Sequence, residues 1–498
     1  MSAPEQVDAV VVGGRIAGPA VAITLARAGR RVVVLERRTL PSDTLSTHVL
    51  VPYAVAEAAR LGALERLLTL DPPRCDMVQA RCGDADVLEP WSAVDGIGYA
   101  LCIPRPEQDL AFAQTAVAAG AELRESCDVT EVLWEDGRAA GVRYVHDGTE
   151  HVLRAKLVVG ADGRRSTVAA EVGAWRPYRG SRNGHLAALR YMDDPLASTR
   201  WGRTMSQWRW GRTIGYTFPT PGGRMVVMLM PPVEDITRFR RDPDGAWDAC
   251  VAEDPLGIAE RIAGATNVTK VRSTADLVSF FRASSGPGWA LAGDAGHFKD
   301  PVIGSGQRDA LRFGRRLGEV AAPLLDEDPA QLDDALRAWE RERDVECLAS
   351  YHWGSRESSR AGSPSSPLIR EVLRTFAGNP DRLADNFNRT RPPEQVIGPR
   401  ALTLGLLNAL HRERGGRGEV LRQALAELPI EAGIRLDRWF SAWRAPVHRA
   451  SERPDFDWPA APQRRASATR AGGDADVDVV GDEAVAGAQP LREAQPVP

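Results

Sequence analysis

The sequence has no closely spaced cysteines, no long apolar run and no excess of one charge. Six cysteines are scattered without a CxxC pair, so we expect no disulfide framework, no bound metal and a reducing cytoplasm. No apolar run is long enough to span a membrane, and the first strand begins near Val7, which leaves no room for a signal peptide. We therefore expect a cytoplasmic protein without a membrane partner. The 63 basic and 67 acidic residues give a net charge of −4, so nucleic acid is not an expected partner either.

The chain has 498 residues, which is enough for two or three domains with a large core. This length suits an enzyme that acts on a small molecule. Residues 451–498 are rich in Pro, Ala, Gly and charge and contain few large apolar side chains. We expect this tail to be disordered.

The stretch VVVGGRIAGPAVAITLARAGRRVVVLERR, from Val10 to Arg38, has the pattern of a βαβ unit. Residues 7–12 predict a buried parallel strand, and residues 16–27 predict a helix that ends before Gly29. A second buried strand ends at Glu36. Gly13 suits the tight turn, Gly18 suits close packing of helix on strand, and the Glu36 carboxylate can accept hydrogen bonds from a ribose.

Arg15 stands where the second glycine of a GxGxxG motif belongs. That glycine normally lets backbone N–H groups approach a pyrophosphate. The Arg15 side chain must therefore point away or reach around the phosphates. The alternative for this stretch is an ordinary glycine-rich turn that binds nothing.

A second pattern lies in GPGWALAGDAGHFKDPVIGSGQRDALRFGRRLGEVAAPLL. It predicts a strand over residues 289–292, Asp294 directly after it, a loop with Pro301, and a helix from Gly306 to about Leu325. An acid at the end of a strand can bond a polyol hydroxyl, and the start of a helix offers free N–H groups and partial positive charge. Together they suit the ribityl chain of a flavin and its N1/C2=O edge.

These two stretches together resemble the group A flavoprotein monooxygenases, the superfamily of para-hydroxybenzoate hydroxylase. The second stretch is also similar to actinobacterial FAD-dependent oxidoreductases that carry a GDAGxxKDP segment. LVVGADGRRSTV resembles the family's GADGxxSxV element, and IPRPEQDLAFAQ resembles a helix whose leading arginine contacts FAD. The resemblance implies bound FAD, with NAD(P)H as a transient co-substrate that has no domain of its own.

The resemblance also implies which residues contact the cofactor. These are Gly13, Gly14, Arg15, Ala17, Gly18, Glu36, Arg37, Arg105, Val129, Asp162, Asp294, Pro301, Gly306, Gln307 and Arg308. The sequence departs from the family at four places. Arg15 replaces a small residue, Arg308 an asparagine found against the flavin ring, Ala169 an arginine, and Gly304-Ser305 a commoner Ala-Gln.

The expected fold is α/β, a Rossmann-like FAD-binding domain interleaved with an antiparallel β-sheet substrate domain and followed by a helical C-terminal region. We expect the FAD-binding domain in two parts, and the predicted segments are 1–182 and 282–326 for FAD, 183–281 for the sheet, 327–450 for the helices and 451–498 for the tail. In the sheet, aromatic and methionine residues are candidates for an apolar cavity or for plain core. They are Trp208, Trp210, Tyr216, Phe218, Met225, Met228 and Met230.

The leading functional hypothesis is an FAD-dependent monooxygenase that uses NAD(P)H and O₂ to hydroxylate or epoxidise an apolar or aromatic small molecule in specialised metabolism. The alternatives are an FAD-dependent reductase or dehydrogenase, a flavin-bound cyclase without net redox change, and a halogenase. WRWGRT only partly matches the halogenase WxWxIP motif. No catalytic residue is identified. His48 and His297 are interpreted as structural or flavin-contacting groups, and the substrate, the choice of NADH or NADPH and the oligomeric state stay open.

Overall fold

A computed structural model describes residues 5–46, 48–254, 257–358, 365–379, 381–443 and 458–461. These residues belong to one compact unit, Met1–Gln463. The predicted disordered tail, 451–498, lies outside the described residues apart from 458–461.

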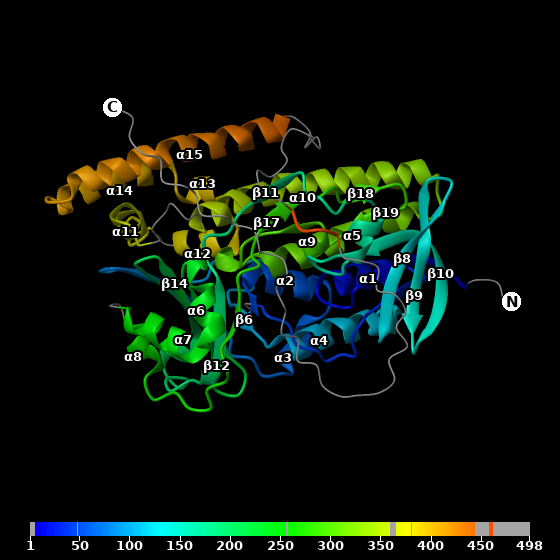
Figure 1. The fold of residues 1–498 in the computed structure, drawn as a ribbon, viewed down its shortest axis with the longest axis horizontal. Coiled ribbons are helices and arrows are strands. Elements are labelled where there is room, and N and C mark those ends of the chain that lie inside the picture. Colours follow the sequence, from blue (N-terminus) through cyan, green and yellow to red (C-terminus); the bar gives the residue numbers. More distant parts are fainter. Residues whose placement is uncertain are drawn as a thin grey trace. The chain divides into compact units, whose positions relative to one another are not determined.

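The first sheet carries the parallel strands expected of a dinucleotide-binding fold (Figure 1). Its parallel strands follow the order β19-β10-β1-β2-β7, and β18, β9 and β8 extend it in antiparallel fashion. The bounds are β1 Glu5–Val12, β2 Val32–Leu35, β7 Glu122–Arg124, β8 Cys127–Glu135, β9 Arg138–His146, β10 Thr149–Gly160, β18 Ser285–Gly286 and β19 Trp289–Leu291. The valines of β1 and β2 are buried on both faces, as a parallel sheet covered on both sides requires.

Helices α1 (Ala17–Arg27), α4 (Arg105–Ala118) and α9 (Gly306–Ala321) lie on one face of this sheet. The β8–β9 hairpin and the short helix α5 (Thr167–Glu171) cover the other face. Helices α1 and α9 touch through small residues. A Cβ added to Gly314 would lie 2.8 Å from Ala20 Cβ, and one added to Gly318 would lie 2.6 Å from Thr24 Cβ. This close packing brings together two segments that are nearly 300 residues apart in sequence.

The second sheet has seven strands in the order β16-β12-β15-β14-β13-β4-β5. The bounds are β4 Met77–Cys82, β5 Ala85–Pro90, β12 Ala187–Asp193, β13 Thr204–Trp210, β14 Thr213–Thr220, β15 Arg224–Met230 and β16 Arg272–Thr274. The expected antiparallel sheet is thus present, but it also takes in β4 and β5 from the segment assigned to the first FAD part. The reason is a long-range parallel pairing of β13 with β4, which no local pattern reveals.

The two faces of this sheet have different neighbours. Trp208, Trp210 and Met225 pack toward α6 (Ile236–Arg241), α7 (Pro243–Ala252) and α8 (Ile258–Ile262). Tyr216, Phe218, Met228 and Met230 face the large core shared with the first sheet. The alternation of side chains along the strands therefore separates the predicted aromatic and methionine residues into two groups.

Small two- and three-stranded sheets and short helices connect these layers. Their bounds are β3 Val49–Leu50, β6 Leu101–Cys102, β11 Arg179–Ser181, β17 Ser279–Phe281, β20 His297–Phe298, α2 Pro52–Arg60 and α3 Leu64–Leu68.

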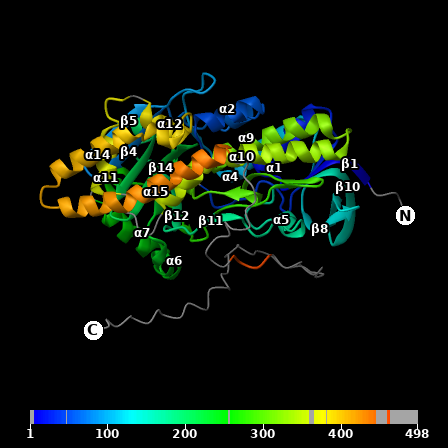
Figure 2. The same ribbon diagram turned by 90° about the horizontal axis from the view of Figure 1, so that it is seen from above.

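The chain continues as a helical region after α9. The bounds are α10 Pro329–Glu357, α11 Pro367–Arg374, α12 Arg382–Asn388, α13 Pro393–Val396, α14 Pro399–Arg412 and α15 Arg417–Trp443. Helices α14 and α15 run side by side (Figure 2). Within the described part of the chain, no helix has both the length and the apolar character needed to cross a membrane.

Candidate cofactor and substrate site

The turn between β1 and α1 has no room for side chains at its glycines. Gly13 has a φ of +111°, and a Cβ there would lie 2.4 Å from the Ala161 carbonyl oxygen. A Cβ at Gly18 would lie 1.9 Å from the carbonyl oxygen of Gly13. Ala17, next to Gly18, packs against Gly293, since a Cβ at Gly293 would lie 2.7 Å from Ala17 Cβ. Neighbouring backbone therefore packs closely around the glycine turn. Because the glycines have no side chains, the backbone N–H groups at the start of α1 are not covered.

Glu36 closes this turn from the end of β2. The Gly14 N–H donates to Glu36 Oε2 at 2.7 Å, and the Arg38 N–H donates to Oε1 at 3.0 Å. Glu36 is buried, whereas Arg37 is exposed. Each carboxylate oxygen has a second lone pair, so Glu36 can hold the turn and still accept bonds from ribose hydroxyls.

Arg15 reaches across the site to the loop after Glu36. Its Nη2 donates to Ser42 Oγ at 2.8 Å, and its Nε lies 3.9 Å from Asp109 Oδ2. Arg105, at the start of α4, binds the same carboxylate at 2.9 Å. Burial lowers the pKa of Arg15, and the carboxylates of Glu36 and Asp109 oppose that shift. The structure thus brings the two predicted arginines, Arg15 and Arg105, to one carboxylate beside the glycine turn.

The segment from Asp294 to Arg308 presents several polar groups without protein partners. Asp294 lies in the 3₁₀ turn Gly293–Ala295, and burial raises its pKa although the charges of Arg164 and Arg105 oppose the shift. None of the described residues donates a hydrogen bond to its carboxylate. Ser305 Oγ and both polar atoms of the Gln307 amide are buried without a partner. Asp309 is the first residue of α9 whose backbone N–H bonds back along the chain, to the Ser305 carbonyl oxygen. No described residue accepts a hydrogen bond from the N–H groups of residues 306–308.

A small, mainly apolar cavity of about 20 Å³, which we call the pocket, lies between the second sheet and the loop that precedes α9. Pro301 begins the 3₁₀ turn Pro301–Ile303 of this loop and lines the pocket. The lining residues are Val49, Val51, Val78, Gln79, Met205, Ser206, Gln207, Tyr216, Phe218, Met228, Pro301, Val302, Gly304 and Phe387. Three of the predicted aromatic and methionine residues, Tyr216, Phe218 and Met228, line it. Trp208, Trp210 and Met225 lie on the opposite face of the sheet, and Met230 lies in the core.

A protein-family model described as an FAD binding domain matches residues 6–323 of this chain. The chain belongs to that family. The match includes both glycine-containing segments and the whole of the second sheet.

Curated relatives of this FAD-binding protein carry the names of reductases. It is 29% identical over 330 residues to the menaquinone reductase of Mycolicibacterium smegmatis. This alignment covers 64% of this chain and 76% of the relative. It is 27% identical over 336 residues to the digeranylgeranylglycerophospholipid reductase of Methanosarcina mazei, with 64% and 75% covered. Among solved structures, the flavin-dependent brominase Bmp2 superposes with a TM-score of 0.65 at 19% identity, covering 82% of this chain and all of that one. This last likeness shows the shared fold.

The residues of this chain fit FAD. The glycine turn forms a cradle that a Cβ would fill, and Glu36 retains lone pairs at the end of β2. Asp294, Ser305 and Gln307 carry polar atoms without protein partners beside the start of α9. A flavin dinucleotide offers a pyrophosphate, a ribose, a ribityl chain and a polar ring edge, which are groups that such atoms bind.

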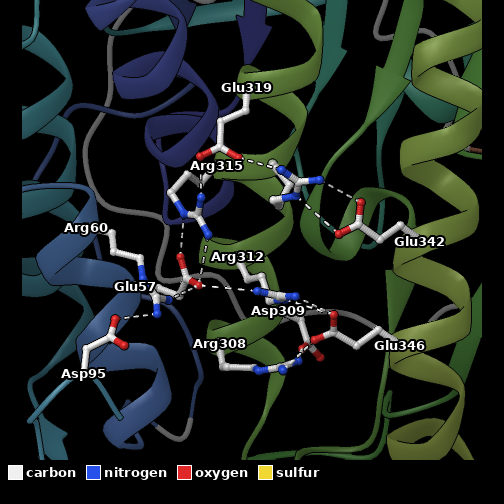
Figure 3. Close-up of polar contacts among 11 residues, drawn as sticks. Glu57, Arg60, Asp95, Arg308, Asp309, Arg312, Arg315, Glu319, Glu342 and Glu346 are labelled. Atoms are coloured by element: carbon white, nitrogen blue, oxygen red, sulfur yellow. Dashed lines mark hydrogen bonds and ion pairs between the residues drawn. The ribbon is translucent and has the colours of Figure 1, made fainter.

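The Arg308 side chain is held by protein carboxylates (Figure 3). Its guanidinium donates to Asp309 Oδ1 and to Glu346 Oε1, both at 2.6 Å, and lies 4.4 Å from the centre of the Tyr53 ring. Burial alone would lower its pKa, but these two carboxylates raise it. Because the side chain is occupied in this way, Arg308 can offer the cofactor its backbone N–H more readily than its charge.

Asp309, in the first turn of α9, is the centre of a buried ion-pair cluster. It pairs with both Lys299 and Arg308, and these cations lower its pKa against the effect of burial. His297, Asp309 and Cys347 place potential metal-ligand atoms within 4.8 Å of one another. The Lys299 ammonium donates a hydrogen bond to the Asp309 carboxylate, and its positive charge repels other cations. This cluster therefore does not suit a metal ion.

Asp162 and Val129 take structural positions in the fold. Ser166 Oγ and the Val168 N–H donate to the Asp162 carboxylate at 2.6 and 3.2 Å, which ties it to the start of α5. Val129 lies in β8 and is buried in the core between the β8–β9 hairpin and the parallel strands.

Arg282, which is not among the predicted site residues, joins the loops around Asp162 and Asp294. The fully buried guanidinium donates to the carbonyl oxygens of Trp175, Ala295 and Arg164. Burial lowers its pKa to about 10. The available signal was an arginine directly after two phenylalanines, in SFFRAS.

The two histidines of interest are buried and neutral. Burial lowers the pKa of His48 to about 3, and its ring contacts the hydroxyl of Tyr191. Burial also lowers the pKa of His297, whose Nε2 lies 3.6 Å from Cys347 Sγ. A neutral imidazole held in this way is a structural group rather than a proton donor at neutral pH.

Proposed function

We propose that this chain uses FAD to reduce a carbon–carbon double bond of an apolar, isoprenoid-like small molecule. The observation that carries the proposal is the apolar lining of this small cavity, which includes Pro301, Val302 and Gly304 directly before the start of α9. The cavity must widen when a substrate of this size binds. The names of the curated relatives support it, since they include reductases of a quinone with an isoprenoid tail and of an isoprenoid lipid.

When bound, FAD would supply two-electron transfer at its ring system. The residues proposed to hold it are Gly13, Gly14, Ala17, Gly18 and Glu36 at the dinucleotide end. At the flavin end they are Asp294, Pro301, Gly306, Gln307 and the Arg308 backbone. Arg15, Arg37, Arg105, Val129 and Asp162 are proposed as further contacts. NAD(P)H is the proposed source of electrons.

The protein's own groups would orient the substrate and exclude water. Val49, Val78, Phe218 and Met228 present hydrocarbon and aromatic surface to the pocket, which favours an apolar substrate over water. Tyr216 keeps its proton on Oη because burial raises its pKa. That hydroxyl donates to the Val302 carbonyl oxygen at 2.7 Å and accepts from Gln207 Nε2 at 2.8 Å, which fixes the sheet against the loop.

NAD(P)H- and O₂-dependent monooxygenation of an aromatic substrate is the second candidate. The observation that favours it is the stacking of Tyr216 on Phe218, whose ring centres lie 5.6 Å apart along the pocket. Flat aromatic surface of this kind suits a planar ring. Halogenation receives less support, because Trp208 and Trp210 of the partial WxWxIP motif point away from the pocket.

The test separates the two reactions by their need for oxygen. The purified flavoprotein would be mixed with NADH or NADPH under strictly anaerobic conditions, with an isoprenoid alcohol and, separately, a phenol as probes. We expect loss of the oxidised flavin absorbance and a product of the isoprenoid that has gained two hydrogens. A product that forms only with O₂ and contains one added oxygen atom would establish the second candidate instead. A protein purified colourless that takes up no FAD would contradict both.

A further inference from the structure

Helix α15 carries a row of exposed apolar side chains along one face. The row consists of Leu421, Leu425, Leu428, Leu436 and Trp439, and we call it the α15 row. Spacings of three, four and eight residues place these side chains on the same face of a helix. Leu425 is 66% exposed and Trp439 is 60% exposed. Most of the large apolar side chains that are exposed among the described residues lie on α15 or on the neighbouring α14. Such a contiguous apolar face indicates an interaction surface.

Helix α14, which contacts α15, also carries exposed apolar side chains and ends in basic residues. Leu404 and Leu407 are exposed, and His411 follows on the same face four residues after Leu407. On α15, Arg417 precedes Leu421 by four residues and is also exposed. Residues 413–416 join the two helices, which run side by side (Figure 2), so the end of α14 and the start of α15 meet at one turn.

A polar hollow lies at this turn. Its basic lining residues are Arg370, Arg374, His411, Arg412 and Arg414. The acidic residues that line it are Asp84 and Glu413, which pair with Arg374 and Arg370. The buried Glu371 also pairs with Arg374 and with Arg412. Four arginines against three carboxylates leave the hollow with a net positive charge. Arg412 and Arg414 are exposed; Arg412 lies 3.6 Å from Glu371, and no described carboxylate pairs with Arg414, so the Arg414 charge in particular is available to an anionic surface.

The acidic residues of α15 mostly face the rest of the protein. Glu427 and Glu431 bind Arg356 of α10 at 2.9 and 2.8 Å. Asp437 binds Arg179 at 2.6 Å. Glu419 is exposed but pairs with Arg422 at 2.6 Å. The outward side of the two helices therefore combines leucines and a tryptophan with arginines, while its carboxylates are paired.

We propose that α14 and α15 dock on the surface of a lipid bilayer that contains anionic phospholipids. The α15 row enters the boundary between headgroups and acyl chains, and the basic turn binds lipid phosphates. Helices with an apolar face and exposed arginines bind bilayers in this orientation without crossing them. The charge of the exposed face selects a bilayer with anionic lipids over a second copy of this chain, which would bring like charges together. This proposal replaces the expectation that a membrane is not a partner.

The pocket shares one element with the helical region that carries the docking helices. Phe387 of α12, in the same helical region, lines the pocket. The docking does not depend on which reaction the flavin carries out, and its test measures binding rather than turnover.

The experiment is flotation of the full-length, flavin-loaded protein with two kinds of vesicle. One is pure phosphatidylcholine, and the other is equimolar phosphatidylcholine and phosphatidylglycerol. We expect binding to the anionic vesicles at least about tenfold tighter than to the neutral ones, with loss of that difference in high salt. The triple variant Leu425→Gln, Leu428→Gln, Trp439→Gln should weaken anionic-vesicle binding at least about tenfold. The pair Arg412→Gln, Arg414→Gln should weaken it about tenfold while leaving the weak binding to neutral vesicles unchanged.

The matched control is Val117→Gln on α4, which replaces another exposed apolar residue far from α15 in the sequence. It should bind vesicles like the wild type, and all variants should keep the wild-type flavin content and helical circular dichroism. Wild-type protein that stays unbound with both kinds of vesicle overturns the proposal. A triple variant that binds vesicles like the wild type also overturns it. So does a triple variant that changes only from dimer to monomer in sedimentation, because the face would then bind a second copy of this chain.

Discussion

Single side chains in the second sheet point either into the pocket or away from it. Met228 lines the pocket, whereas Met225, three residues earlier on β15, is buried against α7. Both side chains are fully buried. Substitutions at these two positions therefore create similar cavities, but only the cavity at Met228 opens to the pocket proposed for the substrate.

Met228→Ala should change substrate selectivity, and Met225→Ala should not. Each substitution should lower the free energy of unfolding by about 2–5 kcal/mol, because each leaves a cavity. Met228→Ala should also raise KM for the isoprenoid substrate several-fold with flavin content unchanged. Steady-state kinetics with unfolding measured in parallel provides the check. Equal effects of both variants on KM would show that the pocket is not the substrate site.

Asp300 makes stability depend on pH. Burial raises the pKa of its carboxyl to about 7, while the Ser358 hydroxyl and the Val302 N–H bond it. The unfolded chain has the ordinary value near 3.8. Between these two values the folded state holds a proton that the unfolded state releases, so this group lowers stability as the pH rises toward 7.

Asp300→Asn should remove this dependence, since its amide oxygen can still accept the Val302 N–H. The free energy of unfolding of the variant minus that of the wild type should increase by about 2–3 kcal/mol when the pH is raised from 5 to 8. Urea unfolding of both proteins at the two pH values measures the difference. A difference that stays constant with pH would mean that the Asp300 carboxyl is ionised throughout this range.

Whole elements were predictable where the pattern was local. The valine runs and glycines gave β1, α1 and β2, and Gly306 marked the start of α9. The pairing of β4 with β13 was not predictable, because it joins residues more than 120 apart through backbone hydrogen bonds. The same holds for Arg308. Its residue type suggested a cofactor contact, but its pairing with Glu346 depends on how α10 packs on α9.

The packing of α9 on α1 offers a test at the level of helices. Gly314→Ala would place a Cβ 2.8 Å from Ala20 Cβ and 2.9 Å from the Ala17 carbonyl oxygen, so the helices must separate. We expect a loss of about 1–3 kcal/mol of stability and weaker FAD binding, because the starts of both helices belong to the proposed FAD site. Fluorescence titration of the deflavinated protein with FAD measures the affinity.

The control for this packing is Gly433→Ala in α15, where a Cβ meets no atom within 4 Å. Alanine has a higher helix propensity than glycine, so this variant should be as stable as the wild type or more stable by up to about 1 kcal/mol. Unchanged FAD affinity in Gly314→Ala would show that the exact distance between the helices does not matter for the cofactor.

At the scale of the whole molecule, the residues proposed for FAD range from position 13 to position 308. In the sequence they fall before and after the segment that forms β12 to β16 of the second sheet. The first sheet and the contact between α1 and α9 bring them together. A ligand that bridges such distant segments stabilises all of them at once, because opening either segment releases it. A ligand bound by one βαβ unit alone would protect only that unit.

FAD should therefore protect both segments of the deflavinated protein from trypsin. At an FAD concentration about 100 times Kd, stabilisation is about 2.7 kcal/mol, so cleavage after Arg30 near α1 and after Arg315 in α9 should slow together. Glu36→Gln, which removes the charge at the proposed ribose contact, should lose about tenfold in FAD affinity and about 1.4 kcal/mol of this protection at both sites. Glu135→Gln, an exposed carboxylate on β8 that lies 3.5 Å from Arg154, should be protected like the wild type. Mass spectrometry of the fragments follows both cuts in one experiment. Protection at Arg30 alone would mean that the two segments do not share one cofactor, and the proposed function would then lose its basis.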